Sequence, residues 1–509
     1  MNTVLHPEVR LLHKSAKQIM DTYAEAAWQS AGDFAQVEEA VRLAILELRM
    51  VLTSAGLRLS AEKSRRAQHC PGCGLLLRAW SLEPRRVVTA EGEATYSPIR
   101  YRCTRCEEDY YPLEEANGLS GSQYTTGAKA VIAETAAQRP YGHVSRSLGG
   151  ERGLSVSPKE VDRTVREVAG WRREEEATLC GSAYGPEAAL LRAADADPLA
   201  GAPALHGFAA WPGTVPALIS VDGAMVRSTR KGPEGLEWFE CRAGVIRSVD
   251  DRARSAALRE RLSESGNRTD DRAARLNDAN REGATHREAA PAAFYTGGVC
   301  APDALFDQLG ASWRKAVPSA SECVFVADGA RWIWDRVQLY FPDAVQVLDF
   351  YHACEHIGSA TSAWFGERTA EAIAWRQTAR KMLLEPGGAS VVIRELLEAL
   401  RDPEKVADPD LLRAEIRYLF GHRHRMRYHR VKERGLPIGS GAMESGIKQM
   451  TTARLRMPGM KWTRDGADAI LRIRAAHLSQ SLRMTTQRRH GTLQQAAAER
   501  YRRPEAIAA

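Results

Sequence analysis

The chain has 509 residues, of which 44% are apolar and 27% charged, and its formal net charge is +7. This length suggests about three domains, and the composition is that of globular protein, with a core large enough to need no disulfide scaffold. No run of about 18 apolar residues occurs, which excludes a transmembrane helix, and residues 1–17 lack the apolar core of a signal peptide. We therefore expect a cytoplasmic location.

The N-terminal part of the chain is predicted to contain two different modules. Residues 1–66 form a predicted helical region, because apolar residues recur at helical spacing and no proline follows Pro7. Residues 67–118 have short alternating segments typical of strands, and they carry two Cys-x2-Cys pairs. We interpret this second module as a zinc ribbon.

The two cysteine pairs predict one structural zinc ion. Two residues between cysteines let both thiolates reach one tetrahedral ion from a tight turn. The gap between the pairs is 29 residues, longer than usual, which suits a ribbon with a long hairpin arm. The alternative is two redox-active pairs. The predicted zinc ligands are Cys70, Cys73, Cys103 and Cys106.

Residues 119–175 are predicted to form a helix-turn-helix module. The last predicted helix begins at Pro158 with Ser157 as its N-cap, and residues 157–168 would be the recognition helix. Residues 176–213 are predicted to be a linker, because Ala, Gly and Pro dominate most of this stretch.

From residue 214 the pattern changes to strands. The order strand–strand–strand–helix–strand–helix–strand over residues 214–352 predicts a mixed α/β sheet with helices on its faces. The charged segment 250–291 has no aromatic residue and is predicted to be a mobile insertion. The predicted remainder is a helical insertion at 353–434, a closing helix within 435–478 and a basic tail at 479–509.

Two aspartates are candidates for metal ligands. Asp222 and Asp328 each follow an apolar strand and each precede a glycine. On neighbouring strands, two such carboxylates could hold two Mg²⁺ ions for in-line phosphoryl transfer. The alternative is that each Asp-Gly pair is an ordinary turn.

Glu444 is the third acidic candidate. It follows a Gly-rich segment and is predicted to lie in the first turn of a helix. Residues 421–474 contain 13 basic and four acidic residues, a net charge of +9. A single glutamate among phosphate-binding groups suits a catalytic acid, and a solvated basic helix face is the alternative. The predicted DNA-binding residues are Arg423, Arg425, Arg427, Arg430, Lys448, Arg454, Arg456 and Lys461.

Taken together, these segments resemble a DDE transposase. They are similar to the ISKra-type group of bacterial insertion-sequence transposases, and to the wider Mutator and hAT-like families, over about residues 60–480. The motifs are Val-Asp-Gly-Ala at 221–224, Ala-Asp-Gly-Ala-Arg-Trp-Ile-Trp at 327–334, Leu-Asp-Phe-Tyr-His-Ala-Cys-Glu-His at 348–356, Ile-Gly-Ser-Gly-Ala-Met-Glu at 438–444 and Met-Lys-Trp at 460–462.

The resemblance implies a fold and a set of site residues. It implies an RNase H-like core with a helical insertion, with Asp222 on the first strand, Asp328 on the fourth and Glu444 on a late helix. These three would be catalytic and would hold two Mg²⁺ ions. Asp349 and His352, in an Asp-x2-His motif after the fifth strand, would shape the site or contact DNA.

The resemblance also implies an activity and partners. The protein would bind the terminal inverted repeats of an insertion sequence and catalyse Mg²⁺-dependent DNA cleavage and strand transfer. Its partners would be double-stranded DNA at the element ends and at the target. A homodimer or larger assembly is expected, because two ends must be held together. Such a protein would be associated with the bacterial nucleoid.

Two other functions remain open. His352, Glu355 and His356 form a His-x-x-Glu-His pattern, which is also the signature of one class of zinc proteases. The cysteine pairs and the helix-turn-helix module would also suit a non-catalytic DNA-binding protein, such as a domesticated transposase.

Overall fold

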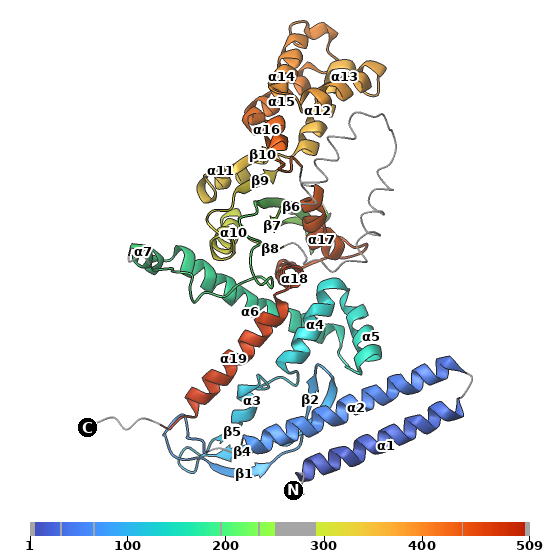
Figure 1. Cartoon of the computed structure of the whole chain (residues 1–509), viewed down its shortest axis with the longest axis vertical. Helices are drawn as coiled ribbons and strands as arrows, with labels where there is room; N and C mark the ends of the chain where they lie inside the picture. Colours follow the sequence, from blue (N-terminus) through green and yellow to red (C-terminus); the bar gives the residue numbers. More distant parts are fainter. Residues whose placement is uncertain are drawn as a thin grey trace. The chain divides into compact units, whose positions relative to one another are not determined.

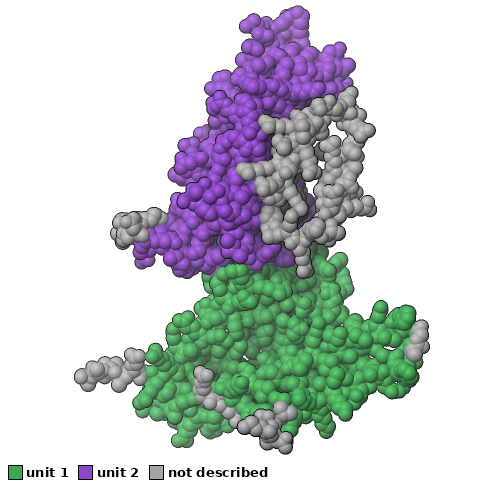
Figure 2. Space-filling model, viewed as in Figure 1, with its two compact units in different colours: residues 1–174, 481–509 green, residues 175–480 purple. Residues whose placement is uncertain are grey.

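The computed structural model describes residues 6–30, 33–64, 67–193, 196–232, 235–249, 292–439 and 441–503. The chain divides into two compact units, Met1–Glu174 with Ser481–Ala509, and Glu175–Gln480 (Figures 1 and 2). The insertion predicted at 250–291 lies outside the described residues. Within the described ranges, no helix combines the length and the apolar character needed to cross a membrane.

Unit 1 begins with two long helices that lie side by side, α1 (Pro7–Gln29) and α2 (Phe34–Lys63) (Figure 1). Asp33 begins α2, because its carboxylate accepts hydrogen bonds from the N–H groups of Ala35 and Gln36. Two small antiparallel sheets follow, with the orders β1-β4-β5 and β2-β3. Their strands are β1 (Arg78–Leu82), β2 (Arg85–Thr89), β3 (Gly92–Tyr96), β4 (Ile99–Arg102) and β5 (Asp109–Tyr110), and the short helix α3 (Pro112–Ala116) comes next.

Three helices complete the N-terminal half, α4 (Thr126–Gln138), α5 (Tyr141–Arg152) and α6 (Pro158–Tyr184). The predicted cap of α6 is confirmed, because the N–H of Glu160 donates to the Ser157 hydroxyl at 3.2 Å. The predicted linker at 176–213 is wrong over its first half, where α6 continues to Tyr184 and α7 (Pro186–Ala193) follows. Alanine is abundant in this stretch, and it has the highest helix propensity of all residues. Its abundance therefore does not distinguish a linker from a helix.

The C-terminal segment returns to unit 1 as helix α19 (Leu482–Arg500), which packs on α3 and α4 (Figure 1). A basic tail was predicted here. The segment is a packed helix and not a tail, because Leu482 and Tyr501 are buried in unit 1 and Arg483 forms an ion pair with Glu134 at 2.7 Å. The positive charges of this segment are therefore partly neutralised within the fold.

Unit 2 contains a five-stranded mixed sheet in the order β10-β9-β6-β7-β8, which confirms the predicted mixed α/β arrangement. The first three strands along the chain are antiparallel: β6 (Ala217–Gly232), β7 (Gly235–Ser248) and β8 (Ala293–Gly298). The last two, β9 (Cys323–Ala327) and β10 (Val345–Leu348), run parallel to β6. Helices α10 (Pro302–Ala316) and α11 (Arg331–Tyr340) connect β8 to β9 and β9 to β10.

Helices cover both faces of this sheet. The Thr296 hydroxyl donates to Gln308 of α10, whereas a Cβ atom on the next residue, Gly297, would meet Met450 of α17. Successive strand residues point to opposite faces, so α10 and α17 lie on opposite sides. The main core of unit 2 forms between the sheet, α10 and α11, with Ile219 and Phe325 among its fully buried residues.

A helical segment follows β10, as the sequence predicted for 353–434. It consists of α12 (Phe350–Phe365), α13 (Ala370–Met382), α14 (Gly388–Ala399), α15 (Pro409–His422) and α16 (Tyr428–Glu433), with two short 3-10 turns. The predicted single closing helix is instead two helices, α17 (Gly441–Leu455) and α18 (Arg464–Leu478). The loop between them contains Pro458 and Gly459 and pairs with β6, since the N–H of Trp462 donates to the carbonyl of Arg227 at 2.9 Å.

Candidate functional site

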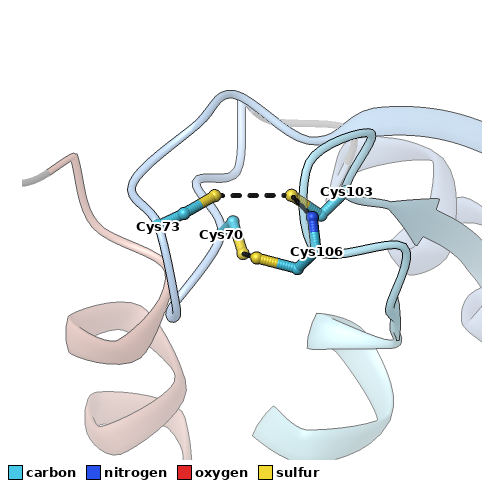
Figure 3. Close-up of side chains that lie close together, drawn as sticks. All are labelled: Cys70, Cys73, Cys103 and Cys106. Carbon is cyan, nitrogen blue, oxygen red and sulfur yellow. Dashed lines mark hydrogen bonds between the residues drawn. The ribbon is translucent and has the colours of Figure 1, made fainter.

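Four cysteines of unit 1 converge on one point (Figure 3). The Sγ atoms of Cys70 and Cys106 are 3.8 Å apart, and those of Cys73 and Cys103 are 3.5 Å apart. Zn–S bonds of about 2.3 Å would place the sulfur atoms of a tetrahedral site about 3.8 Å apart. All four sulfur atoms lie within 4.8 Å of one another, so this cluster could bind one zinc ion.

Tight backbone turns present these thiols. Gly74 has a φ of 71°, and its N–H donates to the carbonyl of Cys70 at 2.8 Å. In the second pair, the N–H of Cys106 donates to the sulfur of Cys103 at 3.4 Å. Cys70 and Cys73 precede β1, while Cys103 and Cys106 lie between β4 and β5. The two pairs are therefore brought together by the β1-β4-β5 sheet.

The electrostatics of the cluster suit a bound cation. Burial opposes ionisation of Cys70, but hydrogen bonds from the Tyr110 hydroxyl and from backbone N–H groups outweigh it and lower its pKa to about 6. The pKa of Cys106 is instead raised to about 12, through its contacts with Cys73 and then Cys70. Four close thiols cannot all ionise unless a positive charge is placed among them, and the thiolate is the form that binds metal.

In unit 2, Asp328 and Asp349 lie at the carboxyl ends of neighbouring parallel strands, and Asp222 lies within the adjacent strand β6, just past its pairing with β9. Asp328 and Asp349 each come directly after the paired residues Ala327 and Leu348 of β9 and β10. The last residue pair between β6 and β9 is Ile219 with Phe325. Asp222 lies three residues past Ile219, and Asp328 lies three residues past Phe325. If the register is continued, Asp222 and Asp328 lie opposite each other.

Asp222 does not end its strand, which corrects the prediction. β6 continues for ten residues to Gly232, paired with β7, and only its pairing with β9 stops before Asp222. The Asp222-Gly223 pair is therefore not a turn. At Asp328 the turn interpretation holds in part, since its carboxylate accepts a hydrogen bond from the N–H of Ala330 at 3.0 Å.

Asp349 is the most buried of the three aspartates, with 3% exposure. Its carboxylate caps α12 by accepting a hydrogen bond from the N–H of His352 at 2.8 Å. This contact explains the aspartate of the Asp-x2-His motif as a helix cap, whereas the histidine contributes only its backbone N–H to the cap. The motif thus begins α12 beside Asp328.

The Gly-rich segment before α17 runs past Asp349. The carbonyl of Ile438 accepts a hydrogen bond from the N–H of Phe350 at 3.0 Å. A Cβ atom on Gly439 would lie 2.9 Å from the ring of Tyr351 and 3.7 Å from the Asp349 carboxylate. The close approach therefore requires glycine. Glu444 lies in α17, which packs on β6 and β7, but its side chain lies outside the described part of the structure.

The predicted DNA-binding residues have three different environments. Arg454 is 1% exposed; its guanidinium lies 5.0 Å from the Trp462 ring, and it donates to the sulfur of Met460. A buried side chain cannot contact DNA, so this prediction is wrong. Arg425 is half-buried over Trp334 at 4.3 Å and bonds Gln346. The exposed members of the set are Arg423, Arg427, Arg430, Lys448, Arg456 and Lys461.

Sequence reasoning missed Tyr418 of α15. Its ring stacks on His356, with 3.6 Å between ring centres, and its hydroxyl occupies the place where a Cβ atom on Gly329 would be. Burial, followed by the nearby Asp328 carboxylate, raises the pKa of Tyr418. No local pattern marks this tyrosine, because it reaches the end of β9 from a helix about 90 residues later.

A comparison with known protein families finds a match for the C-terminal part of the chain. Residues 316–490 match the model of an uncharacterised protein family, UPF0236. The matched segment is about a third of the chain and includes Asp328, Asp349 and Glu444, but neither Asp222 nor the cysteine cluster. No curated protein matches the chain.

Proposed function

We propose that this chain is a DNA transposase of the DDE type, which cleaves and joins DNA strands at the ends of an insertion sequence. The observation that carries the proposal is the position of two aspartates on adjacent strands, Asp222 on the first strand of the sheet and Asp328 directly after the fourth. The strand order and directions support an RNase H-like core. The helical segment α12–α16, before the helix that carries Glu444, supports the insertion that the resemblance implies.

The acidic residues suit Mg²⁺, which prefers carboxylate oxygen ligands. Adjacent strands lie about 4.8 Å apart, so carboxylates at one level of β6 and β9 could share ions. Asp222, Asp328 and Glu444 would hold two ions, and Asp349 and His352 would shape the site. When bound, two Mg²⁺ ions would activate a water or a 3′-hydroxyl group and stabilise the leaving oxygen.

DNA recognition is assigned to both units. In unit 2, the exposed basic residues of 423–461 would contact phosphates, since phosphate contacts supply most sequence-independent affinity. In unit 1, α5 and the start of α6 would form a helix-turn-helix that reads the terminal inverted repeats, next to the cysteine cluster in sequence. Two element ends must be joined, so the active form would be a dimer or larger assembly at the bacterial nucleoid.

The position of Glu355 disfavours a protease. In the His-x-x-Glu-His mechanism, the glutamate must reach a water held by the two histidines. The Glu355 carboxylate lies 3.4 Å from Nδ1 of His352, whereas the histidines face each other through their Nε2 atoms. The carboxylate is therefore on the wrong side of the ring to act as that base.

The test is cleavage of a DNA duplex that carries the element's own end, with purified full-length protein and Mg²⁺. We expect cleavage by the wild type, and loss of cleavage with retained binding in Asp222→Asn, Asp328→Asn and Glu444→Gln. Removal of one negative charge weakens metal binding but not attraction for phosphate.

Two control variants make the test specific. Asp410→Asn, whose side chain is 94% exposed in α15, and Glu433→Gln, exposed in α16, should cleave normally. Cleavage by either aspartate variant at the wild-type rate would refute the acidic triad. Specific end binding by a wild type that never cleaves would instead favour the non-catalytic DNA-binding protein.

A further inference from the structure

The first two turns of α12 bring two histidine rings together. His352 and His356 are four residues apart, so they lie on one face of the helix. Their Nε2 atoms are 3.3 Å apart, and their ring planes are inclined by 80°. Both side chains are partly exposed, at 32% and 24%. Each ring is thus partly accessible to solvent.

A carboxylate lies behind each ring. Nδ1 of His356 is 2.6 Å from Glu415 of α15, and Nδ1 of His352 is 3.4 Å from Glu355. A carboxylate favours the tautomer whose proton lies on the nitrogen facing it. Two such tautomers would direct the lone pairs of both Nε2 atoms at each other. A cation between the rings, either a proton or a metal ion, would remove this repulsion.

The separation of the two nitrogens fits a metal ion. Zn–N bonds of about 2.0–2.1 Å place two nitrogens of a tetrahedral site about 3.3 Å apart, the separation found here. A carboxylate behind each imidazole is also the usual support for a histidine that binds metal. Tyr418 further fixes the ring of His356 by stacking on it.

We propose that His352 and His356 bind one transition-metal ion of the zinc class through their Nε2 atoms, separately from the cysteine cluster, with water completing the coordination. Glu415 is a positioning residue for His356. Both ligands lie on α12, and the contact with Glu415 links His356 to α15. The proposal does not depend on transposase activity, because it concerns metal binding by the full chain.

The test uses Co²⁺ as a probe, added to full-length protein whose cysteine cluster is already loaded with zinc. With the carboxylate site saturated by excess Mg²⁺, we expect calorimetry and visible absorption to show one further Co²⁺ per chain, without the sulfur-to-metal charge-transfer bands of a thiolate site. His352→Ala and His356→Ala should lose this ion. Glu415→Gln should bind it about 10–100-fold more weakly, as expected when a supporting carboxylate is removed.

Controls separate this site from the rest of the protein. His424→Ala, an exposed histidine near the end of α15, should bind Co²⁺ as the wild type does. Cys70→Ser should keep the histidine site while losing the thiolate site. The proposal is overturned if the folded wild type takes up no further Co²⁺, or if both alanine variants bind it unchanged.

Discussion

Both glycines of the Asp-Gly pairs are explained by close approach of a distant side chain. A Cβ atom on Gly223 would overlap the carboxylate of Glu240 on β7, and one on Gly329 would overlap Tyr418. Neither glycine has a positive φ, so backbone conformation does not require it. At these two positions glycine follows aspartate because another side chain occupies the place where a Cβ atom would lie. A turn would give the same two letters in the sequence.

We predict that Gly329→Ala destabilises unit 2. The added methyl group must displace the partly buried Tyr418 ring or the loop that holds Asp328, and overpacking of this kind costs about 1–3 kcal/mol. Thermal unfolding should show a lower melting temperature. Gly421→Ala is the matched control, because this exposed position of α15 has open space around it, and helix propensity favours alanine there by up to about 1 kcal/mol. Equal stability of Gly329→Ala and the wild type would contradict the packing described.

At the scale of elements, the β1-β4-β5 sheet depends on its four cysteines. Cys70 and Cys103 are buried in a small cluster with Leu77, Tyr101 and Tyr110, which offers little apolar area. Small modules of this kind are usually stabilised by a bound metal, whose binding energy becomes folding energy. The sheet should therefore lose its order when the metal is removed.

We predict one zinc ion per chain at this cluster, lost in Cys70→Ser or Cys103→Ser. Mild chelation first removes any metal from the histidine site proposed above. Elemental analysis of the freshly purified protein then measures its zinc content. Cys180→Ser should keep the zinc, because this cysteine lies in α6, far from the cluster in sequence. Protein purified without any zinc would refute the prediction.

At the scale of the whole molecule, the two ends of the chain form one unit. Tyr501 packs edge-on against Tyr110, its hydroxyl bonds Glu115, and its carbonyl accepts a hydrogen bond from the N–H of His69 at 3.1 Å. Unit 1 is thus completed only after unit 2 has been synthesised. The last helix is a structural part of the first module.

We predict that Tyr501→Ala lowers the stability of unit 1 by about 3–5 kcal/mol, the usual cost of truncating a buried aromatic residue. Hydrogen exchange resolved by segment should show faster exchange in β4 and β5 and unchanged exchange in the sheet of unit 2. Gln495→Ala, on the exposed face of α19, should change stability by less than about 0.5 kcal/mol. Unchanged exchange in β4 and β5 of Tyr501→Ala would show that Tyr501 does not stabilise this sheet.

Local patterns in the sequence determined most of the elements. The capping Ser157, the strand and helix order of unit 2 and the paired cysteines all depend on spacings of a few residues, and each is present in the structure. Hydrophobic periodicity and capping act within one or two turns, so they can be read without knowledge of the fold. Asp328 was identified for the same reason, because it follows a short apolar run, whereas Asp349 was identified only through the resemblance to transposases.

Only the tertiary structure decided which side chains meet. Arg454 and Arg456 are both arginines near the end of α17, yet one is buried against Trp462 and the other is exposed. Glu415 reaches His356 across 59 residues of chain, and α19 joins a unit that begins more than 400 residues earlier. Burial and partners depend on packing between elements distant in sequence, and charge or composition alone does not encode them. The sequence by itself therefore determined the elements and the cysteine ligands, while the fold decided the neighbours of the aspartates and histidines.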